Sequence, residues 1–366
     1  MRFGLVGGGL ISHSHIAGAS HKGLAEFCCG CFSRNPEKNR QFGEQYNLDS
    51  ARVYPDYQTM AEQEAARPDK PDFIVVCTPH ISHYEVCKAF LEAGFPVVCD
   101  KPLTVDGAQA EQLAALAREK DLPCCVTYVF SVTPYLDLMR SLCREGRIGN
   151  VYYANLSYRL GRRLAMVMSG VDIWQFKSEQ AGPAGSLSDI CTHIEYIARR
   201  TLDTDLEKVL ARLIRKPGIE LDGSGCILFE TTSGIAGQLD YNQLACGEDD
   251  ICVWLYGDAG TLRWHFGEHD RITIEYTDGR TEIIRDPGVS REEVRGRDSL
   301  APMLFNKHVA AFAITYADYA EVLTAKAQGK AYTVRYPTFE DGLKGVKFIE
   351  AALESHQSGN QWVHLK

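Results

Sequence analysis

A lysine stands at the point where a short apolar segment must stop being a strand. Residues Val97 to Cys99 are apolar, Asp100 and Lys101 follow, and Pro102 cannot continue a hydrogen-bonded ladder. In open α/β sheets, ligands bind beyond the carboxyl ends of the strands. A cation there can hold a ligand oxygen or stabilise negative charge that develops on it. The alternative is a solvated lysine after a strand, because most lysines are exposed.

Asp189 and His193 form a second pair of residues that could do chemistry. They are four positions apart, where a small-residue loop starting at Ala181 runs into a predicted helix. The spacing places both on one helix face near its N-terminus. A helix N-terminus lowers the pKa of an imidazole and keeps it neutral as a base. The alternatives are an exposed Asp–His pair or a metal pair, for which no third ligand is evident.

Small residues follow the first predicted strand, Arg2 to Val6. Gly7 and Gly9 match the first two glycines of the dinucleotide fingerprint, and Ser12 replaces the third. A tight turn, close approach of the backbone to a pyrophosphate and N–H groups at a helix N-terminus all require small residues here. The following helix is predicted over residues 13–21.

The second predicted strand, residues 24–32, ends in Ser33 and Arg34. An Asp or Glu usually binds the free ribose 2′-hydroxyl of NAD at this position. A hydroxyl beside a guanidinium suits a 2′-phosphate better, which slightly favours NADP. The alternative is that Arg34 stacks on the adenine and NAD binds.

Strands and helices alternate through the first third of the chain, which predicts right-handed βαβ units and a parallel Rossmann sheet. Ser82 to Glu85 has the pattern of a capping box at the start of the third of these helices. We therefore predict an α/β dinucleotide-binding domain over residues 1–125. Its further strands are predicted at 72–77, 96–100 and 123–128, and its further helices at 36–46, 83–92 and 109–120.

The pattern changes in residues 126–366, which we predict to be an α+β domain for substrate binding and oligomerisation. A helix over 134–145, with Thr133 as its N-cap, precedes a large, mostly antiparallel sheet. We expect helices on one face and an apolar opposite face that joins a homodimer or homotetramer. The strands are predicted at 151–159, 209–215, 225–230, 235–241, 251–256, 261–266, 272–276 and 281–284, and the closing helices at 306–327 and 339–355.

Composition excludes several classes of partner. The net charge of −9 argues against nucleic acid, and no apolar run is long enough for a membrane span. The N-terminus shows no signal-peptide pattern, so we expect a cytoplasmic protein. Thirteen cysteines include the pair Cys28 and Cys31, but no second ligand pair follows, so free thiols are expected rather than a metal.

Together these motifs resemble the glucose–fructose oxidoreductase and inositol dehydrogenase family (Gfo/Idh/MocA), over nearly the whole chain. Three departures stand out: His80 where Asn is usual, Asp100 for Glu, and Cys191 for Gly. None of them removes Lys101, Asp189 or His193. The resemblance rests on Gly7 to Ser12, Cys77-Thr78-Pro79 with His83, Asp100-Lys101-Pro102, Asp189 with His193, and Tyr336-Pro337-Thr338 through Asp341-Gly342.

The resemblance implies hydride transfer between a nicotinamide and a sugar or cyclitol carbon. Oxidation of a secondary alcohol needs a base, a cation for the developing alkoxide and a fixed nicotinamide. His193 would be the base, Lys101 would hold the substrate oxygen and the cofactor ribose, and Asp189 would orient substrate hydroxyls. The implied NAD(P) contacts come from Gly7, Gly9, Leu10, Ile11, Ser33, Arg34, Cys77, Thr78, Pro79, His83, Asp100 and Lys101.

Aromatic and cationic residues are candidates for a sugar-binding wall, although each could equally be ordinary surface or core. They are Tyr128, Tyr158, Arg163, Trp174 and Lys177, beside Asp189 and His193. Ser33 and the segment Cys99 to Thr104 resemble the branch that includes levoglucosan dehydrogenase and glycoside 3-dehydrogenases. We therefore expect oxidation of a glucose-like sugar or glycoside at carbon 3.

Three alternatives remain. They are an inositol dehydrogenase, a family member that uses NAD in a non-redox cleavage of glycosides, and an inactive nucleotide-binding sensor. A sensor would be expected to have lost Lys101 or His193, and both are present.

Overall fold

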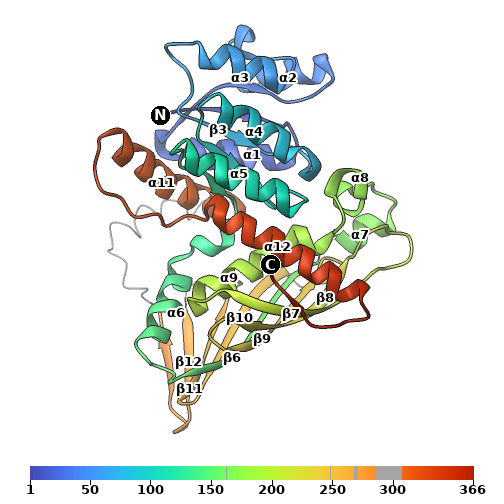
Figure 1. Cartoon of the computed structure of the whole chain (residues 1–366), viewed down its shortest axis with the longest axis vertical. Helices are drawn as coiled ribbons and strands as arrows, with labels where there is room; N and C mark the ends of the chain where they lie inside the picture. Colours follow the sequence, from blue (N-terminus) through green and yellow to red (C-terminus); the bar gives the residue numbers. More distant parts are fainter. Residues whose placement is uncertain (162, 248, 268–270, 286–306) are drawn as a thin grey trace. The chain divides into compact units, whose positions relative to one another are not determined.

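The computed structural model describes residues 1–161, 163–247, 249–267, 271–285 and 307–366. These residues form two compact units (Figure 1). The first contains residues 1–132 and 307–346, and the second contains residues 133–285 and 347–366. Each unit builds one sheet and its own helical cover.

The first unit contains a five-stranded parallel sheet in the order β2-β1-β3-β4-β5. The strand order reverses between β1 and β3, so the carboxyl ends of these strands lie at the topological switch point where such sheets bind ligands. The predicted Rossmann sheet is thereby confirmed. The strands are β1 (Arg2–Val6), β2 (Glu26–Cys31), β3 (Phe73–Val76), β4 (Val97–Cys99) and β5 (Cys125–Val126).

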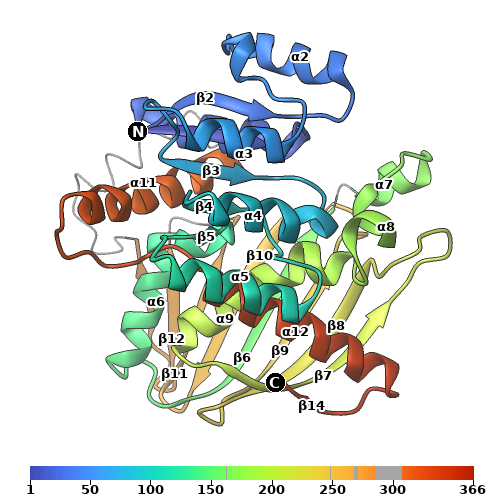
Figure 2. The same ribbon diagram turned by 45° about the horizontal axis from the view of Figure 1, so that its top comes forward.

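Helices cover both faces of this sheet. Helices α3, α4 and α5 pack side by side along one face (Figure 2), and α1 packs against α11. Helix α3 was not predicted, because its apolar positions are sparse and its start depends on Asp56, which accepts a hydrogen bond from the N–H of Thr59. The helices are α1 (Leu10–Ala19), α2 (Pro36–Gln45), α3 (Tyr57–Ala65), α4 (His83–Glu92), α5 (Gly107–Glu119) and α11 (Lys307–Ala327).

The capping box predicted at Ser82 is wrong. Helix α4 begins at His83, and Ser82 forms no side-chain cap. Ser82 Oγ instead lies 2.8 Å from Thr78 Oγ1 and 2.7 Å from the carbonyl oxygen of Pro79, which accepts its proton. The backbone of Ser82 is already helical, since a 3₁₀ turn over His80–Ser82 precedes the helix, and the hydroxyl is directed back toward that turn.

The second unit contains a nine-stranded sheet in the order β13-β12-β11-β10-β6-β9-β8-β7-β14. Every neighbouring pair is antiparallel except β6 and β9. Helices α6 (Pro134–Arg144) and α9 (Thr192–Leu202) pack together, and α9 contacts β6. The strands are β6 (Val151–Leu160), β7 (Leu206–Ile214), β8 (Ser224–Thr231), β9 (Ala236–Asn242), β10 (Asp249–Gly257), β11 (Gly260–His265), β12 (Ile272–Tyr276), β13 (Thr281–Ile284) and β14 (Val363–His364).

The two faces of this sheet differ in composition. Buried side chains such as Leu156, Leu239 and Val253 alternate with half-buried ones of mixed chemistry. The expectation of an apolar second face is therefore wrong, and the homo-oligomer stays a prediction without that argument. The half-buried face carries Tyr153, Asn155, Arg159, Gln238, Asp240, Cys252, Trp254 and His265.

The second closing helix, α12 (Phe339–Gln357), lies near its predicted position. Among the helices described, none combines the length and the apolar composition needed to cross a lipid bilayer.

A hydrogen bond joins α1 and α11, which cover one face of the first sheet. His15 of α1 and Tyr316 of α11 are both buried, and His15 Nδ1 lies 2.7 Å from the Tyr316 hydroxyl. Burial lowers the pKa of His15 to about 4. The native state therefore binds fewer protons than the unfolded chain between pH 4 and pH 6.5.

We expect this histidine to make the protein less stable in weak acid. Its contribution to the free energy of unfolding is fully present above pH 6.5, the pKa in the unfolded chain. Roughly 3 kcal/mol of that free energy is lost as the pH falls toward the pKa of the folded protein. Urea unfolding at pH 7 and pH 4.5 should show a smaller acid loss in His15→Gln than in the wild type. His13→Gln, on the same helix but only half-buried, should keep the wild-type loss; an equal loss in all three proteins would contradict the assignment.

Candidate active site

The glycine loop at the end of β1 fits a dinucleotide pyrophosphate. Gly7 has a φ of +109°, and a Cβ there would lie 2.6 Å from the carbonyl oxygen of Cys77. A Cβ on Gly9 would meet nothing within 4 Å, so protein packing leaves open space at this position. Helix α1 starts at Leu10 with no side-chain cap, and its first N–H groups can bind an anion. The helix begins three residues earlier than predicted.

Leu10 and Ile11, also predicted to contact the cofactor, occupy the first turn of α1. Leu10 is 89% exposed, which is unusual for a leucine, and Ile11 is half-buried. An apolar side chain displayed beside an anion site suits a ligand that has both phosphate and flat apolar parts.

The turn after β2 is held by Asn39. Its Oδ1 accepts from the N–H groups of Phe32 at 2.7 Å and of Ser33 at 3.3 Å. The Ser33 hydroxyl accepts from the N–H of Asn35 at 3.1 Å. Arg34 is exposed, and in the described part of the chain no carboxylate lies within ion-pair distance of it. A guanidinium without an acidic partner can bind a phosphate or stack on a base.

The loops after β3 and β4 are joined by His83. Its Nε2 lies 2.8 Å from the carbonyl oxygen of Thr78, and its Nδ1 lies 2.8 Å from that of Pro102. Burial lowers the pKa of His83. A neutral imidazole donates only one hydrogen bond and an imidazolium donates two, so protonation would tighten the link between the loops. His83 is fully buried and Cys77 nearly so, which places both behind the loop surface.

Lys101 is the half-buried residue that follows β4 and Asp100. Asp100 Oδ1 accepts from the Thr127 hydroxyl at 2.6 Å and from the N–H of Lys101 at 2.9 Å. Burial raises the pKa of Asp100, but nearby His15 and Lys101 and the Thr127 hydrogen bond outweigh it, and the pKa lies below its ordinary value. A carboxylate thus holds the backbone of Lys101 at the carboxyl edge of the sheet.

The predicted Asp189–His193 helix starts differently from the expectation. A π-helical turn over Leu187–Cys191 precedes α9, so Asp189 lies in the π turn and His193 is the second residue of α9. Turns of this kind are rare in proteins, and those that occur are often found at functional sites. The two residues are thus on one continuous helical segment, but the regular α-helix begins only at Thr192.

Asp222 anchors the start of this segment. Its carboxylate accepts from the N–H groups of Gly185 and Leu187, each at 2.7 Å, and from the Tyr241 hydroxyl at 3.0 Å. A Cβ on Gly185 would lie 2.6 Å from the Asp222 carbonyl oxygen, so a glycine is needed for this close approach. Burial raises the pKa of Asp222, and the backbone N–H groups act in the opposite direction.

Two side chains hold Asp189. Arg163 Nη2 lies 3.2 Å from Asp189 Oδ2, and the amide of Gln243 donates to the same oxygen. Gln243 is fully buried and accepts from the Ser186 hydroxyl at 2.9 Å. Sequence reasoning did not identify Asp222 or Gln243. Asp222 precedes β8 and Gln243 follows β9, and neither residue belongs to a recognisable sequence motif. Their role depends on strand pairing.

His193 is buried in the second unit. Its ring meets that of Tyr158 edge to face, with centroids 6.1 Å apart. The structure therefore brings two of the predicted wall residues, Tyr158 and Arg163, to His193 and Asp189.

The other predicted wall residues are Tyr128, Trp174 and Lys177. Tyr128 belongs to the first unit and is fully buried after β5. Trp174 is half-buried in a 3₁₀ turn over Trp174–Phe176, and Lys177 Nζ pairs with Asp172 Oδ2 at 2.7 Å. Lys177 therefore forms an ion pair with a neighbouring carboxylate.

Known families match this chain along most of its length. Residues 1–128 match the oxidoreductase family with an NAD-binding Rossmann fold, and residues 136–263 match the Gfo/Idh/MocA C-terminal domain. The chain therefore belongs to the Gfo/Idh/MocA oxidoreductase family, and the family predicted from the motifs is confirmed.

Individual relatives span the whole chain. The uncharacterized oxidoreductase YfiI of Bacillus subtilis is 28% identical, with 100% of this chain and 97% of that protein covered. An inositol dehydrogenase homolog of Azotobacter vinelandii, solved with NAD⁺, superimposes with a TM-score of 0.89 at 25% identity, over 100% of this chain and 97% of that one. A levoglucosan dehydrogenase, solved with NADH and levoglucosan, has a TM-score of 0.79 at 20% identity over 100% and 99%, which shows the shared fold alone.

Removing the charge of Asp222 should loosen the helical start that carries Asp189. In Asp222→Asn one backbone N–H loses its acceptor, and we expect a loss of about 1–3 kcal/mol in the free energy of unfolding. Urea unfolding measures it. The matched control is Asp240→Asn, whose carboxylate is about one-third exposed in an ion pair with Arg159 and should cost less than about 1 kcal/mol. Equal losses of unfolding free energy in the two variants would show that the Asp222 hydrogen bonds stabilise the protein no more than an exposed ion pair does.

Proposed function

We propose that this protein is an NAD(P)-dependent dehydrogenase that oxidises a secondary hydroxyl, at carbon 3, of a glucose-like sugar or glycoside, or catalyses the reverse reduction. The observation that carries the proposal is the pinned carboxylate of Asp189 on the same helical segment as His193. A fixed hydrogen-bond acceptor beside an imidazole is what recognition and deprotonation of a polyol require.

The first unit supplies the cofactor side of this proposal. Its open glycine loop and exposed Arg34 suit the phosphates of a dinucleotide. Thr78 and Pro79 lie in the loop after β3, and Lys101 lies in the loop after β4. A bound nicotinamide dinucleotide would accept or deliver the hydride. Cys77 and His83 are assigned to holding these loops in place, because their side chains are buried, and the half-buried Asp100 is assigned to holding the backbone of Lys101.

Three side chains share the remaining chemistry. His193 removes the proton of the reacting hydroxyl, and Asp189 accepts hydrogen bonds from a neighbouring hydroxyl of the ring. The Lys101 ammonium stabilises the oxygen as negative charge develops on it, which is the largest contribution expected of a single polar group. Each role matches the group's chemical type and its fixed backbone.

The substrate proposed is neutral. Arg163 is paired with Asp189 and Lys177 with Asp172, so neither cation presents an uncompensated charge for a phosphosugar. The net charge of −9 acts in the same direction. Aromatic Tyr158 beside His193 suits the C–H face of a pyranose.

An inositol dehydrogenase is the second candidate. The solved inositol dehydrogenase homolog covers the whole chain with a TM-score of 0.89. A cyclitol and a pyranose both present secondary ring hydroxyls, so Asp189 and His193 serve either substrate.

A substrate panel tests the activity. Glucosides, their 3-deoxy analogues and inositols are incubated with NAD or NADP, and reduction is followed at 340 nm with product identification by NMR. Turnover of glucosides but not of the 3-deoxy compounds would support carbon 3. Equal turnover of the 3-deoxy analogues would exclude that carbon, and turnover of inositols alone would favour the second candidate. Glycoside cleavage without net change in NADH would contradict the dehydrogenase proposal.

Lys101→Met and His193→Gln should each lower turnover by at least about a hundredfold, the scale of a lost oxyanion donor or general base. Cofactor binding, measured by calorimetry, should be largely kept. Lys88→Met is the matched control, since Lys88 lies on α4 near the Tyr84 ring. Near-normal turnover of Lys101→Met would remove Lys101 from the mechanism.

Arg34 decides the cofactor in this proposal, with NADP slightly favoured over NAD. Arg34→Ala should weaken NADP binding by more than NAD binding, because only NADP carries a 2′-phosphate. Arg40→Ala, which removes an exposed cation paired with Glu37 and Glu44, should change neither affinity appreciably. If Arg34→Ala weakens both cofactors equally, the guanidinium stacks on the adenine instead.

A further inference from the structure

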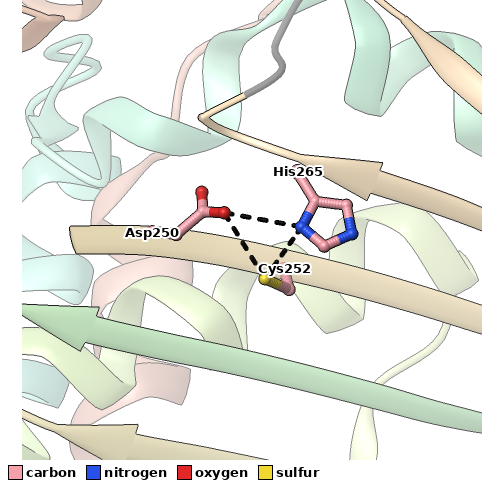
Figure 3. A group of neighbouring side chains, drawn as sticks. All are labelled: Asp250, Cys252 and His265. Carbon is pink, nitrogen blue, oxygen red and sulfur yellow. Dashed lines mark hydrogen bonds and ion pairs between the residues drawn. The ribbon is translucent and has the colours of Figure 1, made fainter. Parts of the chain in front are cut away.

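Three metal-ligating side chains meet on the half-buried face of the second sheet (Figure 3). Cys252 of β10 is the cross-strand partner of His265 of β11, and Asp250 lies two residues before Cys252 on the same strand. Because side chains alternate along a strand, all three project from one face. Among the described residues, they are the group of His, Cys, Asp or Glu side chains whose ligand atoms all lie within 4.8 Å of one another.

Two of the three distances between the ligand atoms are close to those on one face of a metal-centred tetrahedron, and the sulfur–nitrogen distance is shorter. His265 Nδ1 lies 3.4 Å from Asp250 Oδ2, and Cys252 Sγ lies 3.2 Å from that nitrogen and 3.7 Å from that oxygen. Tetrahedral zinc bond lengths place nitrogen and oxygen ligands roughly 3.3–3.4 Å apart, and sulfur roughly 3.6 Å from either. We propose that Asp250, Cys252 and His265 bind a divalent transition-metal cation of the zinc class.

The carboxylate is already oriented for this role. Asp250 Oδ1 accepts from the N–H of Ile251 at 2.8 Å and from that of Gly267 at 2.7 Å. Those two donors occupy Oδ1 and turn Oδ2 toward the sulfur and the imidazole. Supporting hydrogen bonds of this kind orient ligands in metal sites and contribute to their affinity.

The surroundings also suit a cation with one open coordination position. The side chains of His265 and Asp250 are 31% and 22% exposed, so an ion and a water molecule can reach them. The Trp254 ring meets the His265 ring edge to face at 6.1 Å and shields the imidazole. Thiolate, imidazole and carboxylate are the three ligand types that zinc takes in proteins.

The site is separate from the residues proposed for hydride transfer. Ser157 of β6 is the cross-strand partner of Cys252, whereas the next residue, Tyr158, contacts His193. Adjacent strand residues point to opposite faces, so the sheet separates the cluster from α9. The cation would act as a clip between β10 and β11.

A hydrogen-bonded cluster of thiol, imidazole and carboxylate is the competing arrangement, because burial raises the pKa of the Cys252 thiol to about 11. The experiment separates the two. The full-length protein is stripped with a chelator, desalted and dialysed against zinc sulfate, and bound zinc is measured by elemental analysis. Cobalt(II) is then added as a spectroscopic probe, since a thiolate ligand produces an intense charge-transfer band.

The wild type should bind one equivalent of zinc at micromolar concentration and show the cobalt–thiolate band. Cys252→Ser should abolish the band, and both this variant and His265→Gln should lower zinc affinity by at least about tenfold. Cys246→Ser is the matched control, because Cys246 is an exposed cysteine of the same unit, and it should behave as the wild type. His265→Gln keeps the test valid if Cys252→Ser fails to fold. No saturable equivalent in the wild type, or an equal loss in the Cys246 control, would overturn the site.

Discussion

A carboxylate that is buried or half-buried needs hydrogen-bond donors around it, and this requirement places the candidate catalytic residues of both units. Asp100 accepts hydrogen bonds from the Thr127 hydroxyl and from the N–H of Lys101. The second of these holds the backbone of the lysine at the edge of the sheet. Asp222 accepts hydrogen bonds from the backbone N–H groups of Gly185 and Leu187. These bonds determine where the helical segment with Asp189 and His193 begins. Thr127 follows β5 whereas Asp100 follows β4, and Gly185 and Leu187 are distant in the chain from Asp222, so these hydrogen bonds also join separate elements.

The two units differ in the groups that the proposed chemistry would use. In the first unit the backbone itself would bind a dinucleotide, through small residues and the start of α1. In the second unit side chains would act on the substrate, and they have rigid support: Asp189 has Arg163 and Gln243, and His193 has the Tyr158 ring. Family members that share the first unit can therefore differ in substrate through a few side chains of the second.

The half-buried face of the large sheet has a chemistry of its own. Side chains of mixed polarity replace the apolar surface expected there, and Asp250, Cys252 and His265 meet on it. Spacing along the chain indicates only Cys28 with Cys31 and Asp189 with His193 as possible metal pairs, and neither has a further ligand at a suitable spacing. Cys252 and His265 are thirteen residues apart and are brought together by strand pairing, which no spacing rule identifies.

The sequence by itself determined the Rossmann sheet, the positions of most strands along the chain and those of Gly7, Lys101 and His193, since periodicity and turn residues are local signals. It also predicted where α12 lies. Only the tertiary structure decided that Ser82 does not cap α4, that a π turn carries Asp189, and that Gln243 and Asp222 support it. The support from Gln243 and Asp222 depends on hydrogen bonds between residues distant in the chain, and the free energy of such bonds exists only once the strands and helices have packed together. The Ser82 hydroxyl bonds within its own turn, and there the 3₁₀ geometry decides.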